Sequence, residues 1–232
     1  MKKKMVLIIV LLALIIGGIL VFKNIKIDDV VKEKTNKTTE KDKTKEDENK
    51  EEFEIEQIDG IYYIDGVLIA NKTYSLPSDY NPGGLLEEFT SNFTKMQRAA
   101  SSEGISLNII SGFRSYETQE TLYNRYAARD GKELADTYSA RPGHSEHQTG
   151  LAADINSVDQ SFEDTEEGIW LNNNCYKYGF IIRYPKGKED ITGYIFEPWH
   201  IRYVGVSLAT TLYNDGDWIT LEEYYNITSS YN

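Results

Sequence analysis

Hydrophobic and polar positions are arranged in three different ways along this chain. Residues 5–22 are uncharged and largely apolar, residues 24–56 are dominated by Lys, Glu, Asp and Thr, and the remainder mixes short apolar runs with polar residues. These patterns are typical of a membrane-spanning helix, a solvated linker and a folded domain, respectively. We therefore expect a Lys cluster and a transmembrane anchor over 1–23, a flexible linker over 24–56 and a folded domain over 57–232.

The folded domain is expected to combine helices with short strands. Apolar residues recur at helical spacing over 86–100, and residues 116–130 form a second helix that Ser115 can cap. Alternation on either side of Asp65-Gly66 predicts a hairpin. Because no regular strand–helix alternation is present, the predicted class is α+β. The remaining expected elements are strands at 105–113, 151–156, 180–185 and 194–204, a helix-like stretch at 166–179, and a capping box between Thr220 and Glu223.

The apolar segment at 5–22 has the features of an uncleaved anchor. Its eighteen residues approach the length needed to cross a bilayer, and the three lysines before it favour a cytoplasmic N-terminus and an exported remainder. Its end, GGILVFKN, has no small-x-small cleavage site and no lipoprotein cysteine. As a coil, the linker would span roughly 30 Å and hold the folded domain away from the membrane.

Composition narrows the possible partners of the folded domain. The chain has a net charge of −12, and residues 57–232 alone carry 13 basic and 25 acidic side chains. Nucleic acid is therefore excluded as a partner, since binding phosphates requires clustered Lys and Arg. The single cysteine, Cys175, rules out an intramolecular disulfide and a cysteine-rich zinc site, and we expect it to be buried. We expect a monomer.

All three histidines lie in two short segments that also contain acidic residues. RPGHSEHQTGLAADI spans 141–155, and EPWH spans 197–200. Zinc in hydrolases commonly takes three ligands from His, Asp and Glu and keeps a fourth position for water. The candidate ligands are therefore His147, Asp154 and His200.

Glu197 is the candidate base that would take a proton from water beside the metal. It precedes His200 by three residues, and strict strand alternation would place the two side chains on opposite faces. Pro198 lies between them and predicts an edge position, a bend or a bulge, so the spacing does not exclude cooperation. Trp199 is expected in the core.

These motifs resemble those of a known peptidase family. SEHQTGLAAD fits the S-x-H-x-x-G-x-A-x-D pattern, and EPWH the E-x-W-H pattern, of zinc peptidases of the VanY type. SGFRSYETQ, YGFIIRYPKGK and EPWHIRYVG are similar to further family segments in the same order, and the resemblance covers about residues 58–213. The family includes D-alanyl-D-alanine carboxypeptidases, L,D-carboxypeptidases and VanX-type dipeptidases, and its fold is related to the hedgehog signalling domain. The resemblance implies a small antiparallel sheet flanked by helices, with zinc in a surface cleft.

The resemblance also implies the chemistry of the site. One zinc ion (Zn2+) would be bound by His147, Asp154 and His200, and it would lower the pKa of its water to about 7. Glu197 would be the catalytic base that takes a proton from this water and passes it to the leaving amine. Arg114 matches the family's arginine that faces the substrate carbonyl, where it would stabilise the negative charge that develops on the oxygen.

Three further residues are assigned to the surroundings of the metal. Gln119 and Ser145 match family positions that line the substrate site. His144 stands three residues before His147 but falls outside the family's ligand pattern, so we expect it to line the cleft without binding the metal.

Together with the expected anchor, the resemblance implies a carboxypeptidase that acts on peptidoglycan stem peptides outside the cytoplasmic membrane. We favour a D,D-carboxypeptidase, which removes the C-terminal D-alanine of the pentapeptide. The closest alternative is an L,D-carboxypeptidase, which removes D-alanine from the tetrapeptide. An endopeptidase that cleaves within stem peptides is a second alternative, and a zinc-stabilised domain that only binds is a third. The presence of both Glu197 and Arg114 argues against the last.

Overall fold

The computed structural model describes residues 53–231. The expected Lys cluster and anchor, and the expected linker up to residue 52, lie outside these residues. Within them, no helix is both long and apolar enough to cross a membrane. The first described strand begins at Ile55, two residues before the position at which we expected the folded domain to start.

A three-stranded antiparallel sheet built on two Asp-Gly turns opens the described part of the chain. Both residues of each turn, Asp59-Gly60 and Asp65-Gly66, have positive φ, as two-residue hairpin turns require. The second turn confirms the expected hairpin. The first was not expected, because every residue of its leading strand is exposed and continues the polar pattern of the linker. The strands pair in sequence order: β1 (Ile55–Ile58), β2 (Ile61–Ile64) and β3 (Val67–Ile69).

A four-stranded antiparallel sheet forms the centre of the fold. Its strands, in spatial order, are β4 (Ile109–Ser111), β5 (Ala152–Ile155), β7 (Glu197–Tyr203) and β6 (Phe180–Tyr184). All of β5 is buried, and so are the first six residues of β7. Pro198 predicted an edge position, a bend or a bulge. The edge position is excluded, since β7 has a partner strand on each side.

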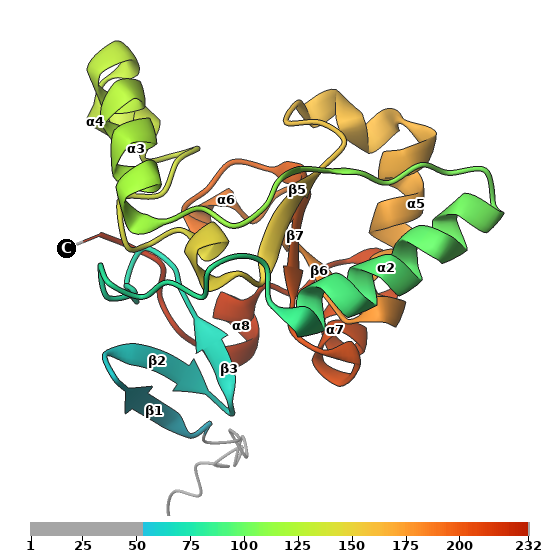
Figure 1. Cartoon of the computed structure of the whole chain (residues 1–232), viewed down its shortest axis with the longest axis horizontal. Helices are drawn as coiled ribbons and strands as arrows, with labels where there is room; N and C mark the ends of the chain where they lie inside the picture. Colours follow the sequence, from blue (N-terminus) through green and yellow to red (C-terminus); the bar gives the residue numbers. More distant parts are fainter. Residues whose placement is uncertain (1–52, 232) are drawn as a thin grey trace, which may run out of the picture. The chain divides into compact units, whose positions relative to one another are not determined.

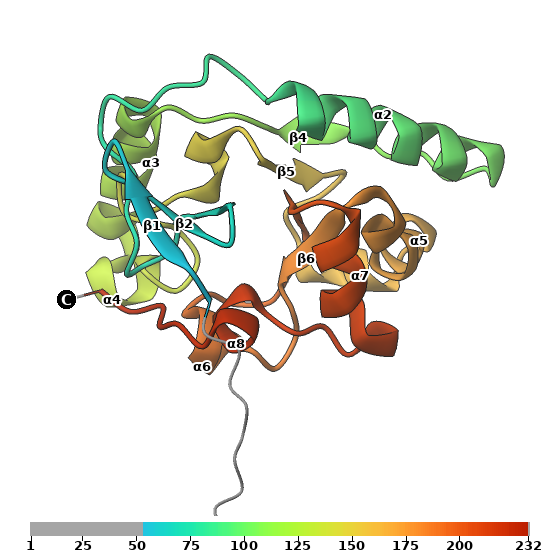
Figure 2. The ribbon, with the colours of Figure 1, turned by 90° about the horizontal axis from the view of Figure 1, so that it is seen from below.

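Helices lie on both sides of this sheet. Figure 1 shows α2, α5 and α7 grouped on one side and α3 with α4 on the other, and Figure 2 shows the same arrangement from below. The expected stretch at 166–179 is divided between α5 and the 3-10 helix η3. The bounds are α2 (Glu87–Ser102), α3 (Tyr116–Asp130), α4 (Lys132–Ala135), η1 (Glu146–Thr149), η2 (Gln160–Asp164), α5 (Glu166–Asn174), η3 (Cys175–Tyr178), α6 (Glu189–Thr192), α7 (Val206–Tyr213), η4 (Asn214–Gly216) and α8 (Leu221–Tyr225).

The main core lies between α2, α5, α7 and the four-stranded sheet. The buried face of α2 includes Phe89 and Phe93, whose ring centroids lie 5.1 Å and 6.4 Å from that of Phe180 on β6. Cys175 is fully buried in this core, as expected. Mixed helices and small antiparallel sheets confirm the α+β class, with the difference that two sheets are present.

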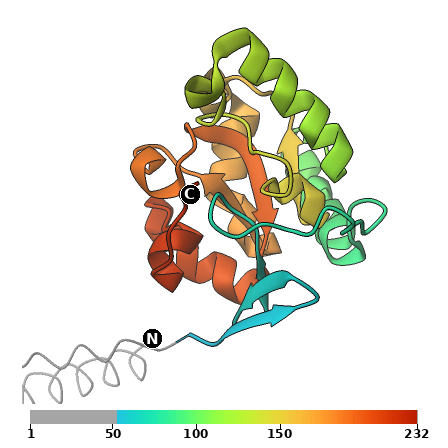
Figure 3. The same cartoon turned by 90° about the vertical axis from the view of Figure 1, so that its left-hand side faces the viewer.

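Local hydrogen bonds fix the ends of several helices. Ser115 accepts a hydrogen bond from the Thr118 backbone at the start of α3, and the capping box of Thr220 and Glu223 begins α8. After α8, the chain returns alongside residues 71–74 (Figure 3), where the Asn71 side chain donates to the Thr228 carbonyl at 3.1 Å. The C-terminal segment is thus attached to the chain between β3 and α2.

Candidate metal and substrate site

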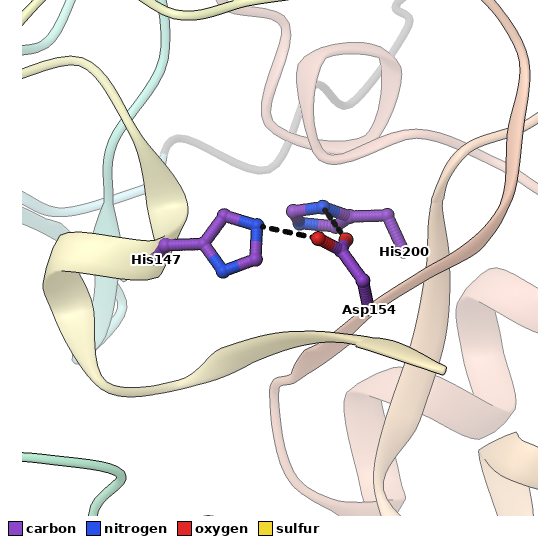
Figure 4. Close-up of side chains that lie close together, drawn as sticks. All are labelled: His147, Asp154 and His200. Carbon is purple, nitrogen blue, oxygen red and sulfur yellow. Dashed lines mark ion pairs between the residues drawn. The ribbon is translucent and has the colours of Figure 1, made fainter. Parts of the chain in front are cut away.

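The three predicted metal ligands lie together, although they come from three different elements. His147 is on η1, Asp154 on β5 and His200 on β7, and one ligand atom of each lies within 4.8 Å of the others. Asp154 and His200 are direct cross-strand partners. Asp154 lies between the imidazoles, 3.3 Å from His147 Nε2 and 3.2 Å from His200 Nδ1 (Figure 4).

The segment between the first two ligands depends on small residues. Gly150 ends η1 with φ of 72°, and a Cβ at this position would lie 2.6 Å from the Gly84 carbonyl oxygen. A larger residue would therefore displace the turn that carries His147 into β5. Ala152 and Ala153 follow with no exposed surface, which lets the strands on either side approach the site.

Each imidazole has one ring nitrogen engaged away from Asp154. His147 Nδ1 lies 2.7 Å from the Gly112 carbonyl oxygen, to which it donates, so Nε2 keeps its lone pair. His200 Nε2 lies 3.3 Å from Glu146 Oε2, and Nδ1 faces Asp154. Two imidazole nitrogens and one carboxylate directed at one point fit a zinc ion with an open fourth position.

The charges of the site suit a cation. The pKa of Asp154 is held below its usual range, because His147 and His200 outweigh the opposing effect of burial. Burial lowers the pKa of His147. Burial also acts to lower the pKa of His200, but hydrogen bonds to Asp154 and Glu146 raise it to about 9. A metal ion bound here would compete with protons for the two imidazole nitrogens and the carboxylate.

Glu197 reaches the same site because the β6–β7 pairing is irregular. Ile182 pairs with Ile201 but Tyr184 pairs with Glu197, so two steps along β6 correspond to four along β7. The strict alternation that would separate Glu197 from His200 fails here, and Glu197 Oε2 lies 3.6 Å from His200 Nδ1. Burial raises the pKa of Glu197 to about 8.

Arg114 lines the same cavity as the metal ligands, and its backbone N–H donates to the His147 carbonyl at 3.1 Å. Its Nη1 donates to Gln119 Oε1 at 2.8 Å and its Nη2 to Ser111 Oγ at 2.9 Å. Burial lowers the pKa of Arg114, while the nearby carboxylates of Asp154 and Glu197 act in the opposite direction. The guanidinium is thus held in a fixed orientation at the wall of the cavity that the metal ligands also line.

Gln119 does not line the cavity but lies directly behind it. Its side chain is only 1% exposed, and its Nε2 donates to the Ala140 carbonyl at 2.6 Å and to Ser139 Oγ at 3.3 Å. The amide therefore joins Arg114 to the segment that forms the opposite edge of the site. The geometry gives Gln119 the position of a support for Arg114.

The other two residues assigned to the cleft differ in their surroundings. Ser145 lines the cavity and is 4% exposed. His144 does not line it: its Nδ1 lies 2.8 Å from the Asn71 carbonyl oxygen and its ring packs against Tyr231. The expectation that His144 lines the cleft is therefore wrong. Trp199 is buried in the core, as expected, and one part of it also borders the cavity.

A cavity of about 400 Å³ extends from the metal ligands to α3. Its inner end is formed by His147, Asp154, Glu197 and His200, together with Tyr184 and Tyr194. Its outer end is formed by Leu122, Tyr126 and Arg129 of α3, with Tyr138. The cavity is large enough for the end of a peptide chain, and the predicted ligands and Glu197 are among its buried lining residues.

A buried group of charged residues behind His200 was missed from the sequence. Glu146 contacts Arg183 and Arg202, and Arg183 also contacts Glu222; each of the four is at most 2% exposed. The available signal was a charged residue inside two apolar strand segments, FIIRYP and HIRYV, since such residues are rarely buried without a partner.

Fold and site together define a metallopeptidase: an α+β domain with a two-His, one-Asp metal site and a buried glutamate at the end of a peptide-sized cavity. Comparison with known proteins is consistent with this class. The profile of the VanY family, D-alanyl-D-alanine carboxypeptidase, matches residues 84–206. This chain therefore belongs to the VanY family of zinc-dependent carboxypeptidases, which confirms the predicted family and the predicted enzyme class.

Three similar proteins illustrate the range of the family. The putative carboxypeptidase YodJ of Bacillus subtilis is 40% identical over 200 residues, which cover 74% of this chain and 72% of that protein. The LD-carboxypeptidase LdcB superposes with a TM-score of 0.70 and 42% identity, covering 78% of this chain and all of that structure. The vancomycin resistance D,D-pentapeptidase VanY, solved in complex with Zn(II), gives a TM-score of 0.59 and 35% identity, covering 67% and 96%, respectively.

Proposed function

We propose that this chain is a zinc-dependent carboxypeptidase that removes the C-terminal D-alanine from peptidoglycan stem peptides. The observation that carries the proposal is the cluster of His147, Asp154 and His200 at the inner end of a cavity that also presents Glu197 and Arg114. The substrate class is proposed from the family, whose profile describes a D-alanyl-D-alanine carboxypeptidase.

Glu197 and Arg114 have positions that suit peptide hydrolysis. His147, Asp154 and His200 would hold a zinc ion, which would supply an acidified water and a Lewis acid for the scissile carbonyl. Glu197 accepts a proton from the attacking water and delivers it to the leaving amine of D-alanine. Its pKa of about 8 in the metal-free site would fall beside a cation, because an opposite charge favours the carboxylate. Arg114 donates to the carbonyl oxygen as negative charge develops on it.

The D,D and L,D specificities are supported by different observations. A D,D-carboxypeptidase is supported by the family profile and by the similarity to the VanY D,D-pentapeptidase. An L,D-carboxypeptidase is the second candidate, because the LdcB structure matches a larger part of this chain with a higher TM-score. Both reactions release one D-alanine through the same groups, and they differ in the residue that precedes the scissile bond.

We also propose that the enzyme acts outside the cytoplasmic membrane as a monomer. The apolar run at 5–22, the lysines before it and the charged residues at 24–56 support an anchor and a linker of roughly 30 Å. Labelling of a cysteine introduced at position 40 by a membrane-impermeant reagent in intact cells tests the orientation. Labelling only after lysis would contradict it.

The test of the proposed activity uses the full-length chain with purified pentapeptide and tetrapeptide muropeptides. Mass spectrometry follows the loss of one alanine, with and without a chelator. Chelator-sensitive loss from the pentapeptide alone establishes a D,D-carboxypeptidase, and loss from the tetrapeptide alone an L,D-carboxypeptidase. A zinc-loaded chain that releases no alanine from either contradicts the proposal and leaves an endopeptidase or a binding domain.

A further inference from the structure

We propose that Glu146 is a positioning residue that fixes the imidazole of His200 with its proton on Nε2, so that Nδ1 is the nitrogen available to a metal ion. The inference rests on the proposed zinc site and adds a residue outside the predicted set of ligands. Glu146 directly precedes the ligand His147 in the chain but contacts the other histidine.

The two carboxylate oxygens of Glu146 have separate partners. Oε1 accepts from Arg183 Nε at 2.7 Å and from Arg202 Nη1 at 3.1 Å, while Oε2 lies 3.3 Å from His200 Nε2. A carboxylate beside two guanidinium groups is ionised and can only accept hydrogen bonds. His200 Nε2 must therefore donate, and its neutral ring has the lone pair on Nδ1, on the side of Asp154.

The carboxylate is held in this orientation by contacts that reach distant parts of the fold. Both terminal nitrogens of Arg183 donate to Glu222 of α8, at 2.8 Å and 2.6 Å, and Asn71 Nδ2 donates to the same carboxylate at 2.9 Å. Arg202 Nη2 donates to the Leu68 carbonyl of β3 at 2.7 Å. Arg183 and Arg202 thus hold the Glu146 carboxylate directly, and each has a further partner elsewhere in the fold, Glu222 for Arg183 and the Leu68 carbonyl for Arg202.

This asymmetry predicts the outcome of a nearly isosteric substitution, Glu146→Gln. Two arginine donors require an acceptor at the Oε1 position, so the amide oxygen will stay there and the amide nitrogen will face His200 Nε2. Because that nitrogen donates, Nε2 must accept, and the proton of the neutral ring moves to Nδ1. Asp154 Oδ1 would accept this proton, which leaves no lone pair for a metal. The metal-free variant keeps its hydrogen bonds but loses zinc affinity.

The experiment measures zinc affinity by competition with a chromophoric chelator and records ¹⁵N chemical shifts of the histidine side chains in the full-length chain. We expect Glu146→Gln to weaken zinc binding by about 10- to 100-fold, the range seen for residues that orient metal ligands. In the metal-free variant at alkaline pH, His200 should carry its proton on Nδ1. His147, which is oriented by the Gly112 carbonyl, should be unchanged and serves as an internal control.

The matched control is Glu222→Gln, which removes a charge from the same buried group without touching His200. It should lower the Tm while the folded protein binds zinc within about threefold of wild type. An equal loss of zinc affinity in the two variants, or none in Glu146→Gln, overturns the proposal. If Glu146→Gln does not fold, the ¹⁵N chemical shifts of the zinc-loaded wild type provide the test. A protonated His200 Nε2 supports the proposal, and a metal-bound Nε2 overturns it. A wild type that binds no zinc would instead contradict the proposed function itself.

Discussion

The two walls of the cavity are built in different ways. The inner wall, with His147, Asp154 and His200, is carried by η1 and the central strands β5 and β7, and each of these residues is at most 6% exposed. The outer wall belongs largely to α3, which buries only Gln119 and Tyr123. At its rim the Arg129 side chain is 64% exposed and pairs with the neighbouring Asp130.

This difference indicates that the two walls have different roles. Groups that must hold a metal ion and a base to within a fraction of an ångström are placed on elements buried on both faces, where neighbours restrict each rotamer. Side chains of the outer wall have fewer fixed partners, and under the proposed function they would accept parts of the substrate that differ between stem peptides. We therefore expect substitutions of the inner wall to act on catalysis, and those of the outer wall to act weakly and mainly on substrate binding.

The largest effect is expected for Glu197→Gln on the inner wall. Loss of the base should lower kcat by roughly 10²- to 10⁴-fold. Zinc content should stay at the wild-type level, because the amide leaves the three ligands in place. Turnover of muropeptides and metal analysis of the same sample provide the measurement. Near wild-type turnover by a zinc-loaded Glu197→Gln protein would remove Glu197 from the role of base.

Arg114, which lies between the two walls, should have the next largest effect. Arg114→Ala removes a donor to the developing oxyanion and should lower kcat by roughly 10²- to 10³-fold. The companion variant Gln119→Ala keeps the guanidinium but removes its support, so a loss of about tenfold is expected, by analogy with residues that orient metal ligands. If Gln119→Ala were as inactive as Arg114→Ala, Gln119 would have a direct role in the reaction.

Removal of the metal should make the stability of the inner wall depend on pH. In the metal-free fold the pKa is about 9 for His200 and about 8 for Glu197, against 6.5 and 4.5 as ordinary values. At pH 6.5 to 8 the folded state therefore holds more protons on these two groups than the unfolded state does. The free energy of unfolding consequently falls as the pH rises toward 9. The Tm of the chelator-treated chain should be lower at pH 9 than at pH 6.5 by roughly 10 °C.

Zinc should weaken this trend, because the ion binds more tightly as the ligands lose their protons. The zinc-loaded chain should consequently show a smaller decrease of Tm over the same pH interval. If the Tm of the chelator-treated chain does not change between pH 6.5 and 9, His200 and Glu197 hold no more protons in the folded state than in the unfolded state.

The smallest effect is expected for Arg129→Ala on the outer wall. An exposed ion pair contributes about 0–1 kcal/mol, so the Tm should change little. We expect KM to change by less than about threefold, with kcat unaffected. A large fall in kcat would show that the outer wall also takes part in the chemistry, and the comparison between the walls would fail.

Sequence patterns predicted the site best where its residues lie only a few positions apart in the chain. The ligands His147 and Asp154 are seven residues apart, and Glu197 and His200 three, so each pair forms a recognisable motif. Caps and turns were also predicted well: Ser115, the capping box at Thr220 and the Asp65-Gly66 hairpin depend on neighbouring residues alone.

Contacts between distant residues could not be predicted. Glu146 and Arg183 are 37 residues apart, and Asn71 and Glu222 are 151 apart, so no local pattern connects them. Gln119 was correctly placed on a helix, but whether it faces the cavity or the space behind Arg114 depends on how α3 packs. His144 was misplaced for the same reason.

The sequence by itself determined which chemical groups this protein has for hydrolysis, and in which order along the chain, because residue type and spacing are local properties. Only the tertiary structure decided how those groups are oriented. The irregular pairing of β6 with β7 brings Glu197 to His200, and the buried charges behind them set which ring nitrogen faces the metal site. Both outcomes depend on contacts between residues far apart in the sequence, and the fold determines which residues make these contacts.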